Sequence, residues 1–320
     1  MNTFFKENCL GLVCGGIVFY LGLVRYYRYQ HIQALRRQYP DPQSVLEDIT
    51  IAREIHAATV QKEFPFLTLR GTELALFKTF SIPTISKLLV ATGEFKSRCA
   101  RRAEDTELLT LEMTEVFGRI QNQRLKCPYT SQADIDLQWT RAQTAVKRLN
   151  EIHGKYKIRN EDFIYTLSLF VFEPIAWVNQ FGYRAMDPRE INVYANQSIR
   201  YSVHNWQVAQ PTIDHLLTRL PACMRHAFYG FVVKLLPTLI GQHDADALGL
   251  PRASRLLSFL YSVMMQGYAW MVRYLRLPRS FFMIRTPFYA DLQGRFMPEY
   301  HAYPIVYQEG YRIVELGTKK

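Results

Sequence analysis

One histidine, His153, lies where an imidazole could bind a metal inside an apolar core. Around it, apolar residues recur at three- and four-residue steps, which places them on one face of a predicted helix. These residues are Ala142, Ala145, Val146, Leu149, Ile152 and Tyr156. An unpartnered polar group in an apolar core costs roughly 2–7 kcal/mol, so the ring must hydrogen-bond to a neighbour or bind a metal. The pattern leaves both hypotheses open, a structural core histidine and a metal ligand.

A second group of side chains, Arg102, Asp105 and Thr106, combines a cation, a carboxylate and a hydroxyl on one predicted helix. Residues three and four apart share a helix face, so these three are expected to lie together. One interpretation is a candidate catalytic cluster. The other is a solvated ion pair with a threonine beside it, which contributes little to stability.

The composition predicts a folded protein with one large domain rather than a disordered chain. Of the 320 residues, 48% are hydrophobic and 14% aromatic, enough to bury a core and to line a pocket for a large apolar molecule. The net charge of +11 comes without a basic tract that contains aromatics, so a membrane surface explains it better than nucleic acid. The five cysteines form no C-x-x-C pair, which argues against a disulfide framework or thiolate metal site and fits a reducing compartment.

The N-terminal region predicts a membrane anchor. Residues 9–24 form an uncharged run of sixteen, followed by the sequence Arg-Tyr-Tyr-Arg, and a membrane span needs about 17–25 residues. A cleaved signal peptide is the alternative, but the run does not end at a small-x-small site. We therefore expect a transmembrane helix at 9–27 after a short non-cytosolic segment at 1–8. The arginines that follow the helix indicate a cytosolic location for the rest of the chain.

The remainder of the chain is predicted to be all-α. After a basic segment and linker at 28–42, a helical domain is expected at 43–280 and an irregular C-terminal extension at 281–320. The capping-box pair Ser44 and Glu47 predicts a helix that reaches Phe64. Further helices are expected at 73–80, 82–93, 95–117, 163–178, 212–220, 224–240 and 254–275.

Three segments interrupt the helical pattern. Residues 65–72 are expected to form a turn, and the polar run at 118–136 a surface insertion. The helix that carries the histidine then begins at Asp134 or Asp136. Residues 305–314 are expected to pair as a small hairpin. The sequence contains no G-x-G-x-x-G, phosphate loop, H-E-x-x-H or G-x-S-x-G motif, so it lacks common signatures of nucleotide, zinc-protease and hydrolase sites.

Five segments stand in an order that is moderately specific, although each is short. They are F-K-T-F-S-I-P-T-I-S-K-L-L-V-A-T-G at 77–93, R-x-x-D-T at 102–106, R-L-N-E-I-H-x-x-Y-x-I-x-N-x-D-x-x-Y-T-L-S-L-F at 148–170, E-P-x-x-W at 173–177 and L-P-R at 277–279. Together they resemble the fungal ER-bound oxygenases of the mpaB type. Those proteins are more distantly similar to the bacterial latex-clearing rubber oxygenases.

The resemblance implies a globin-like helical core that holds a b-type haem. It implies that His153 is the axial iron ligand and that Arg102 and Thr106 lie near the haem. A neutral imidazole is a common haem ligand, so the resemblance favours the ligand hypothesis over the structural one. His56 and His204 are the other candidate ligands if His153 does not bind the iron.

This chain departs from the rubber enzymes at Asp105, where those enzymes have a lysine. A carboxylate cannot supply the same distal group or charge, so the distal role of that lysine does not carry over to this chain. Asp105 is a candidate catalytic residue, and under the non-catalytic alternative below the departure marks lost chemistry. The rubber enzymes also have an acidic residue upstream of the arginine, and the segment at 74–93 contains no acid.

The resemblance therefore implies a membrane-anchored, haem-dependent oxygenase at the endoplasmic reticulum membrane, with dioxygen as co-substrate. The expected reaction is oxidative cleavage of a carbon–carbon double bond in a prenyl or other lipophilic substrate, in meroterpenoid or similar secondary-metabolite biosynthesis. Two alternatives stay open. One is a non-catalytic lipid- or isoprenoid-binding protein, and the other is a haem enzyme that performs hydroxylation or cyclisation.

Overall fold

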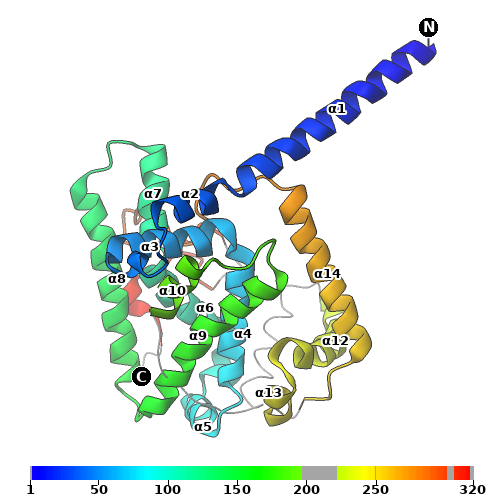
Figure 1. Ribbon diagram of the computed structural model, residues 1–320. Helices are drawn as coiled ribbons and strands as arrows, with labels where there is room; N and C mark the ends of the chain where they lie inside the picture. The colour runs from blue at the N-terminus through cyan, green and yellow to red at the C-terminus, as the bar shows by residue number, and fades with distance from the viewer. Residues whose placement is uncertain (1, 197–221, 249, 301–305, 318–320) are drawn as a thin grey trace.

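The computed structural model describes residues 2–196, 222–248, 250–300 and 306–317 (Figure 1). These residues form helices joined by short connections, and they contain no strand beyond an isolated antiparallel bridge between Phe296 and Tyr311. The α-helices are α1 (Asn2–Arg28), α2 (Gln30–Gln38), α3 (Ile49–Ala57), α4 (Pro65–Thr79), α5 (Pro83–Thr92), α6 (Glu94–Thr114), α7 (Val116–Lys126), α8 (Gln132–His153), α9 (Asn160–Phe181), α10 (Pro188–Asn196), α12 (Ala222–Ile240), α13 (Gln242–Ala247) and α14 (Arg255–Tyr274). The all-α prediction is confirmed for the described residues. The predicted helix at 212–220 lies outside them.

The N-terminal helix α1 extends away from the rest of the molecule, and α2, at the inner end of α1, lies against the helical body (Figure 1). Ile32 and Leu35 of α2 are buried against Val45 and Ile55. In the described part of the chain, no helix is both long and apolar enough to cross a membrane. The predicted transmembrane helix at 9–27 is therefore not supported, since its uncharged run of sixteen residues falls short of the roughly twenty that a span requires.

An antiparallel pair, α4 and α9, forms the centre of the bundle. Near the start of α4, the ring of Phe64 stacks on Tyr183 with the centroids 5.3 Å apart. Beyond the other end of α4, the Thr84 hydroxyl donates to Asp162 over 2.7 Å. Pro174 lies inside α9, as predicted.

The beginning of the helical domain differs from the prediction. The helix after the linker is capped by Asp48, whose carboxylate accepts from the Thr50 amide over 2.7 Å, and Ser44 instead begins a short 3₁₀ turn. The predicted turn at 65–72 is wrong, because Pro65 occupies the first turn of α4, where a missing amide hydrogen costs little.

The predicted surface insertion is also largely wrong. The helix expected at 95–117 ends at Thr114, and the polar run that follows contains a further helix, α7. Arg119 of α7 is fully buried. The next helix, α8, begins at Gln132 and is capped by Ser131 rather than by either predicted aspartate. The polar composition of the run therefore reflects buried ionic contacts as well as surface.

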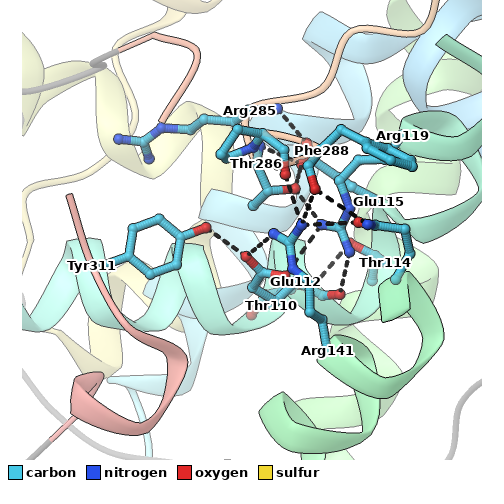
Figure 2. A network of polar contacts seen from close by, with 12 residues as sticks. Thr110, Glu112, Thr114, Glu115, Arg119, Arg141, Arg285, Thr286, Phe288 and Tyr311 are labelled. Carbon is cyan, nitrogen blue, oxygen red and sulfur yellow. Dashed lines mark hydrogen bonds and ion pairs between the residues drawn. The ribbon is translucent and has the colours of Figure 1, made fainter. Parts of the chain in front are cut away.

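Those contacts form a network that holds the C-terminal tail to α6, α7 and α8 (Figure 2). The Glu112 carboxylate accepts from Arg141 over 2.7 Å and from the Tyr311 hydroxyl over 2.6 Å. The Glu115 carboxylate accepts from the Thr286 amide over 2.8 Å. Because an unpaired buried charge is very costly, the network fixes the course of the tail.

The tail itself is irregular, as predicted, except for the short 3₁₀ helix η3 (Ile313–Glu315). The hairpin expected at 305–314 is wrong. Tyr311 exchanges backbone hydrogen bonds of 3.0 and 2.8 Å with Phe296, which lies much earlier in the tail. Gly310 takes a φ of +75° immediately before this bridge, a conformation that favours glycine.

Candidate functional site

A cavity of about 950 Å³ lies between α4, α5, α6, α8 and α9. Its volume is near the upper end of the range of roughly 300–1,000 Å³ that is usual for small-molecule and cofactor sites. Three of the four predicted site residues line it, namely Arg102, Thr106 and His153. The structure therefore brings together side chains from two helices that are far apart in sequence.

The cavity is elongated along α6. Residues of α6 that line it recur at three- and four-residue steps from Arg102 to Thr114. Twelve residues of α-helix rise about 18 Å, so the cavity is long enough for an extended apolar molecule. Most of its wall is aliphatic or aromatic, with Leu109, Leu149 and Phe170 as examples.

His153 is the last residue of α8, and its half-buried side chain faces the cavity. The ring packs against Phe163, with the centroids 5.5 Å apart, and within the described residues the imidazole makes no hydrogen bond. Burial, assisted by the nearby Arg102 cation, lowers the pKa of His153. The ring is therefore neutral at pH 7, and a nitrogen lone pair is available to a metal. Val146, on the predicted inward face, is 44% exposed, so that face is narrower than the pattern indicated.

Arg102 and Thr106 lie one helical turn apart on α6. The guanidinium donates to the Thr106 hydroxyl, and the hydroxyl donates to the backbone oxygen of Arg102 over 2.8 Å. No carboxylate among the described residues forms an ion pair with Arg102, although the charges of Asp105 and Glu94 partly offset the burial that lowers its pKa. The guanidinium therefore borders the cavity as a cation with N–H groups available for an anion.

Asp105 does not join the other three residues. Its buried carboxylate accepts from the hydroxyl of Tyr307 in the tail and lies 3.9 Å from Arg101. Burial raises the pKa of Asp105, and the Tyr307 hydrogen bond opposes that shift. Asp105 lies three residues after Arg102, at the edge of the face of α6 that lines the cavity, and there Tyr307 of the tail contacts it. A catalytic role for Asp105 stays a prediction.

His56 of α3, one of the two alternative candidate ligands, also lines the cavity. Its ring lies 5.1 Å from the ring of Tyr194, and burial lowers its pKa to about 4. The signal for this location was its place beside Ala52 and Ile55 on the buried face of a predicted helix. His204, the other alternative ligand, lies outside the described residues.

Sequence reasoning missed the residues that line the cavity near the start of α4. They include Glu115, Tyr268, Arg276 and Arg279. Burial raises the pKa of Glu115 to about 7, against hydrogen bonds from the Thr286 side chain and backbone. The L-P-R segment that ends at Arg279 was the one feature of the sequence that pointed to any of these four residues. No local sequence pattern indicates that they lie close to α4.

Comparison with known proteins finds three relatives, all from Penicillium. The chain is 31% identical over 197 residues to the ER-bound oxygenase mpaB' of Penicillium brevicompactum, which is 58% of this chain and 42% of that protein. It is 32% identical over 185 residues to the ER-bound oxygenase mpaB of Penicillium roqueforti, 55% of this chain and 56% of that protein. The ER-bound oxygenase mpaB of Penicillium brevicompactum is 31% identical over 197 residues, 58% of this chain and 45% of that protein.

The chain thus spans about half the length of the curated relatives it matches. No family model matches it, and no solved structure matches it, so the globin-like arrangement stays a prediction. The relatives confirm the resemblance seen in the sequence: over a little more than half of its length, the chain is similar to the fungal ER-bound oxygenases of the mpaB type.

Proposed function

We propose that this protein is a haem-dependent oxygenase that acts on a lipophilic substrate. The observation that carries the proposal is the position of His153, whose neutral imidazole borders a cavity of about 950 Å³ without a hydrogen-bond partner among the described residues. The names of the relatives support the oxygenase class.

The residues around the cavity fit a haem. The described residues contain no group of three or more His, Cys, Asp or Glu side chains arranged for a metal ion. A haem needs no such group, because the porphyrin supplies most of the iron ligands and one histidine from the protein is enough to hold the iron. His153 would bind the haem iron, and the guanidinium of Arg102, which has no carboxylate partner among the described residues, would bind a propionate. The apolar wall suits the flat face of the porphyrin.

When bound, the haem would supply activation of dioxygen. The chain itself would contribute binding and orientation. The apolar wall would hold the lipophilic chain and exclude water, and the hydrogen bond between Arg102 and Thr106 would fix the cation that binds the propionate.

The reaction we propose is oxidative cleavage of a carbon–carbon double bond in a prenyl or other lipophilic chain. The double bond breaks, and each of its carbons receives one oxygen atom of a single dioxygen molecule, which gives two carbonyl products. The electrons balance without an external reductant. By analogy with the ER-bound relatives, we also propose that the protein associates with the endoplasmic reticulum and acts in secondary metabolism.

The test is the absorption spectrum and iron content of the purified full chain. The account predicts a Soret band and about one iron per protein, with the pyridine haemochrome of haem b. A folded protein that takes up neither iron nor haem, even after haem is supplied, would instead be a lipid- or isoprenoid-binding protein. Consumption of dioxygen with formation of carbonyl fragments from a polyprenyl substrate would separate cleavage from hydroxylation or cyclisation.

A further inference from the structure

The cavity has a second cationic region, at the opposite end from His153. His153 packs against Phe163 near the start of α9, which lies at the C-terminal end of α4. At the other end, Arg279 donates to the backbone oxygen of Lys62, three residues before α4 begins, over 3.0 Å. The Tyr268 ring packs against Phe66 in the first turn of α4, with the centroids 5.2 Å apart.

The course of α6 along the cavity also places His153 and the arginines at opposite ends. Arg102 lies near His153, whereas the backbone oxygen of Thr114 accepts from Gln61 over 3.2 Å, next to Lys62. Twelve residues of helix, or about 18 Å, therefore separate the two ends of the cavity along α6. The cavity joins a histidine at one end to a pair of arginines at the other.

The arginines at this second end carry uncompensated charge. Neither Arg276 nor Arg279 forms an ion pair with a carboxylate of the described residues, while Arg70 on the same wall pairs with Glu73 over 2.6 Å. Glu63 raises the pKa of Arg279, but burial outweighs this and the pKa is lowered; the Glu63 carboxylate lies 3.7 Å from the Arg184 guanidinium.

A third cation adds to the charge. Arg28 is 3% exposed, donates to the backbone oxygen of Arg276, and lies with its guanidinium carbon 5.0 Å from the centroid of the Tyr183 ring. Within the described residues it also forms no ion pair with a carboxylate. Close cations repel one another, and Arg276 and Arg28 both lower the pKa of Arg279, so an anion that binds between them gains more than it would at a single surface arginine.

Arg276 makes a cation accessible from solvent at this end of the cavity. Its side chain is exposed and also lines the cavity, while Arg279 is half-buried behind it. The Tyr268 hydroxyl has no hydrogen-bond partner among the described residues and adds a neutral donor at the same place. Guanidinium groups bind carboxylates and phosphates through paired N–H donors.

We propose that Arg276, Arg279 and Tyr268 bind the oxyanion head group, a carboxylate or a phosphate, of an amphiphile whose apolar chain extends along α6 toward His153. The proposal deepens the proposed function by naming the class of its substrate. It also fixes the orientation of the substrate, because the head group stays at the arginine end and the distal part of the chain reaches the histidine.

The experiment measures displacement of Nile red, an uncharged fluorescent dye, from the full chain by oleate, oleyl phosphate and oleyl alcohol. We expect at least one of the two anions to displace the dye at about tenfold lower concentration than the alcohol, because a charge-assisted contact is strong in a poorly solvated site. Preference for oleate assigns a carboxylate head group, and preference for oleyl phosphate assigns a phosphate. Equal displacement by all three ligands would overturn the proposal.

Matched variants locate the site. Arg279→Gln should reduce the preference for the anion to about twofold or less while displacement by oleyl alcohol stays unchanged, and Arg279→Lys should retain most of it. Arg252→Gln removes the same charge from an exposed residue outside the cavity wall and should have no effect. If Arg102→Gln abolishes the preference and Arg279→Gln does not, the head group binds at the histidine end and the proposal fails.

The readout requires neither haem nor turnover. A protein without haem that still prefers the anion would refute the proposed oxygenase and leave this site in place. A haem protein that binds all three ligands equally would refute the head-group site and leave the proposed oxygenase in place.

Discussion

Arg102 and Thr106 hydrogen-bond to each other across one turn of α6 while both border the cavity that contains His153. The Thr106 hydroxyl also donates to the backbone oxygen of Arg102, so its single proton is already used. This pairing makes Thr106 a residue that orients the arginine rather than a free donor to a bound molecule. It predicts that Thr106→Ser keeps the orientation of Arg102 and that Thr106→Val loses it.

The role of Arg102 can be measured through haem affinity. Arg102→Gln removes the cation that we expect to bind a propionate, and a hydrogen bond to a charged group contributes about 1.5–3 kcal/mol. The dissociation constant for haem should therefore rise by roughly 10- to 100-fold in a haem-transfer titration. Arg98→Gln is the control, since Arg98 pairs with Glu94 over 2.6 Å and does not line the cavity. Equal haem affinity in both variants would contradict the assignment.

Gly71 is predicted to be required for the close packing of α4 against α9. A Cβ atom at this position would lie 2.6 Å from the Cα of Pro174, which is backbone and cannot move aside cheaply. Gly71→Ala should therefore lower the free energy of unfolding by about 1–3 kcal/mol, measured by urea denaturation. Gly267→Ala in α14 adds the same methyl group where nothing lies within 4 Å, and it should raise stability by about 0.5–1 kcal/mol. If both variants changed the free energy of unfolding in the same direction, this explanation would be refuted.

Arg285 tests the buried network that attaches the tail. It is fully buried and pairs with Glu104 and, over 2.9 Å, with Glu107. Arg285→Met would leave buried carboxylate charge without its partner, which costs about 3–5 kcal/mol in unfolding free energy. Arg159→Met, at an exposed pair 3.6 Å from Glu161, should cost less than about 1 kcal/mol. If Arg285→Met lowered the free energy of unfolding by less than about 1 kcal/mol, the attachment of the tail would not depend on this ion pair.

The stability of the protein is predicted to fall in mild acid because of His56. Burial lowers the pKa of His56 from 6.5 to about 4. The unfolded chain therefore takes up a proton at this residue as the pH falls through 6.5, while the folded protein stays unprotonated until about pH 4. The contribution is present above pH 6.5 and is lost as the pH falls toward 4, by up to about 3 kcal/mol.

The measurement compares urea unfolding of the wild type and His56→Phe at several pH values across this window. Carboxylates titrate in both proteins, so the difference between the two curves isolates the histidine. The stability of the wild type should decline more steeply with acid than that of the variant. Parallel curves would mean that His56 has an ordinary pKa.

The sequence predicts the local features of the candidate site well. The inward direction of His153 follows from helical periodicity, and the pairing of Arg102 with Thr106 follows from their spacing of four. Pro83 and Gly93 mark the two ends of α5, where the glycine adopts a φ of +68°. These features depend on neighbours within one or two helical turns.

The features that sequence reasoning missed depend on partners far along the chain. Asp105 shares the spacing of Arg102 and Thr106, but Tyr307, about two hundred residues later, binds its carboxylate. Arg119 lies in a polar run that looked like surface, and it is buried because Glu112 and Thr286 contact it. No local pattern of hydrophobicity identifies a polar residue whose partners come from the tail.

The central claim concerns the His153 imidazole, and haem retention by His153→Ala tests it most directly. The account predicts that this variant folds with wild-type helical content, measured by circular dichroism, and loses its haem on gel filtration, while His56→Ala retains it. Added imidazole, which can fill the space left by the side chain, should restore part of the Soret absorbance of His153→Ala. Undiminished haem in His153→Ala, with loss in His56→Ala, would contradict the account and assign the axial position to the other histidine.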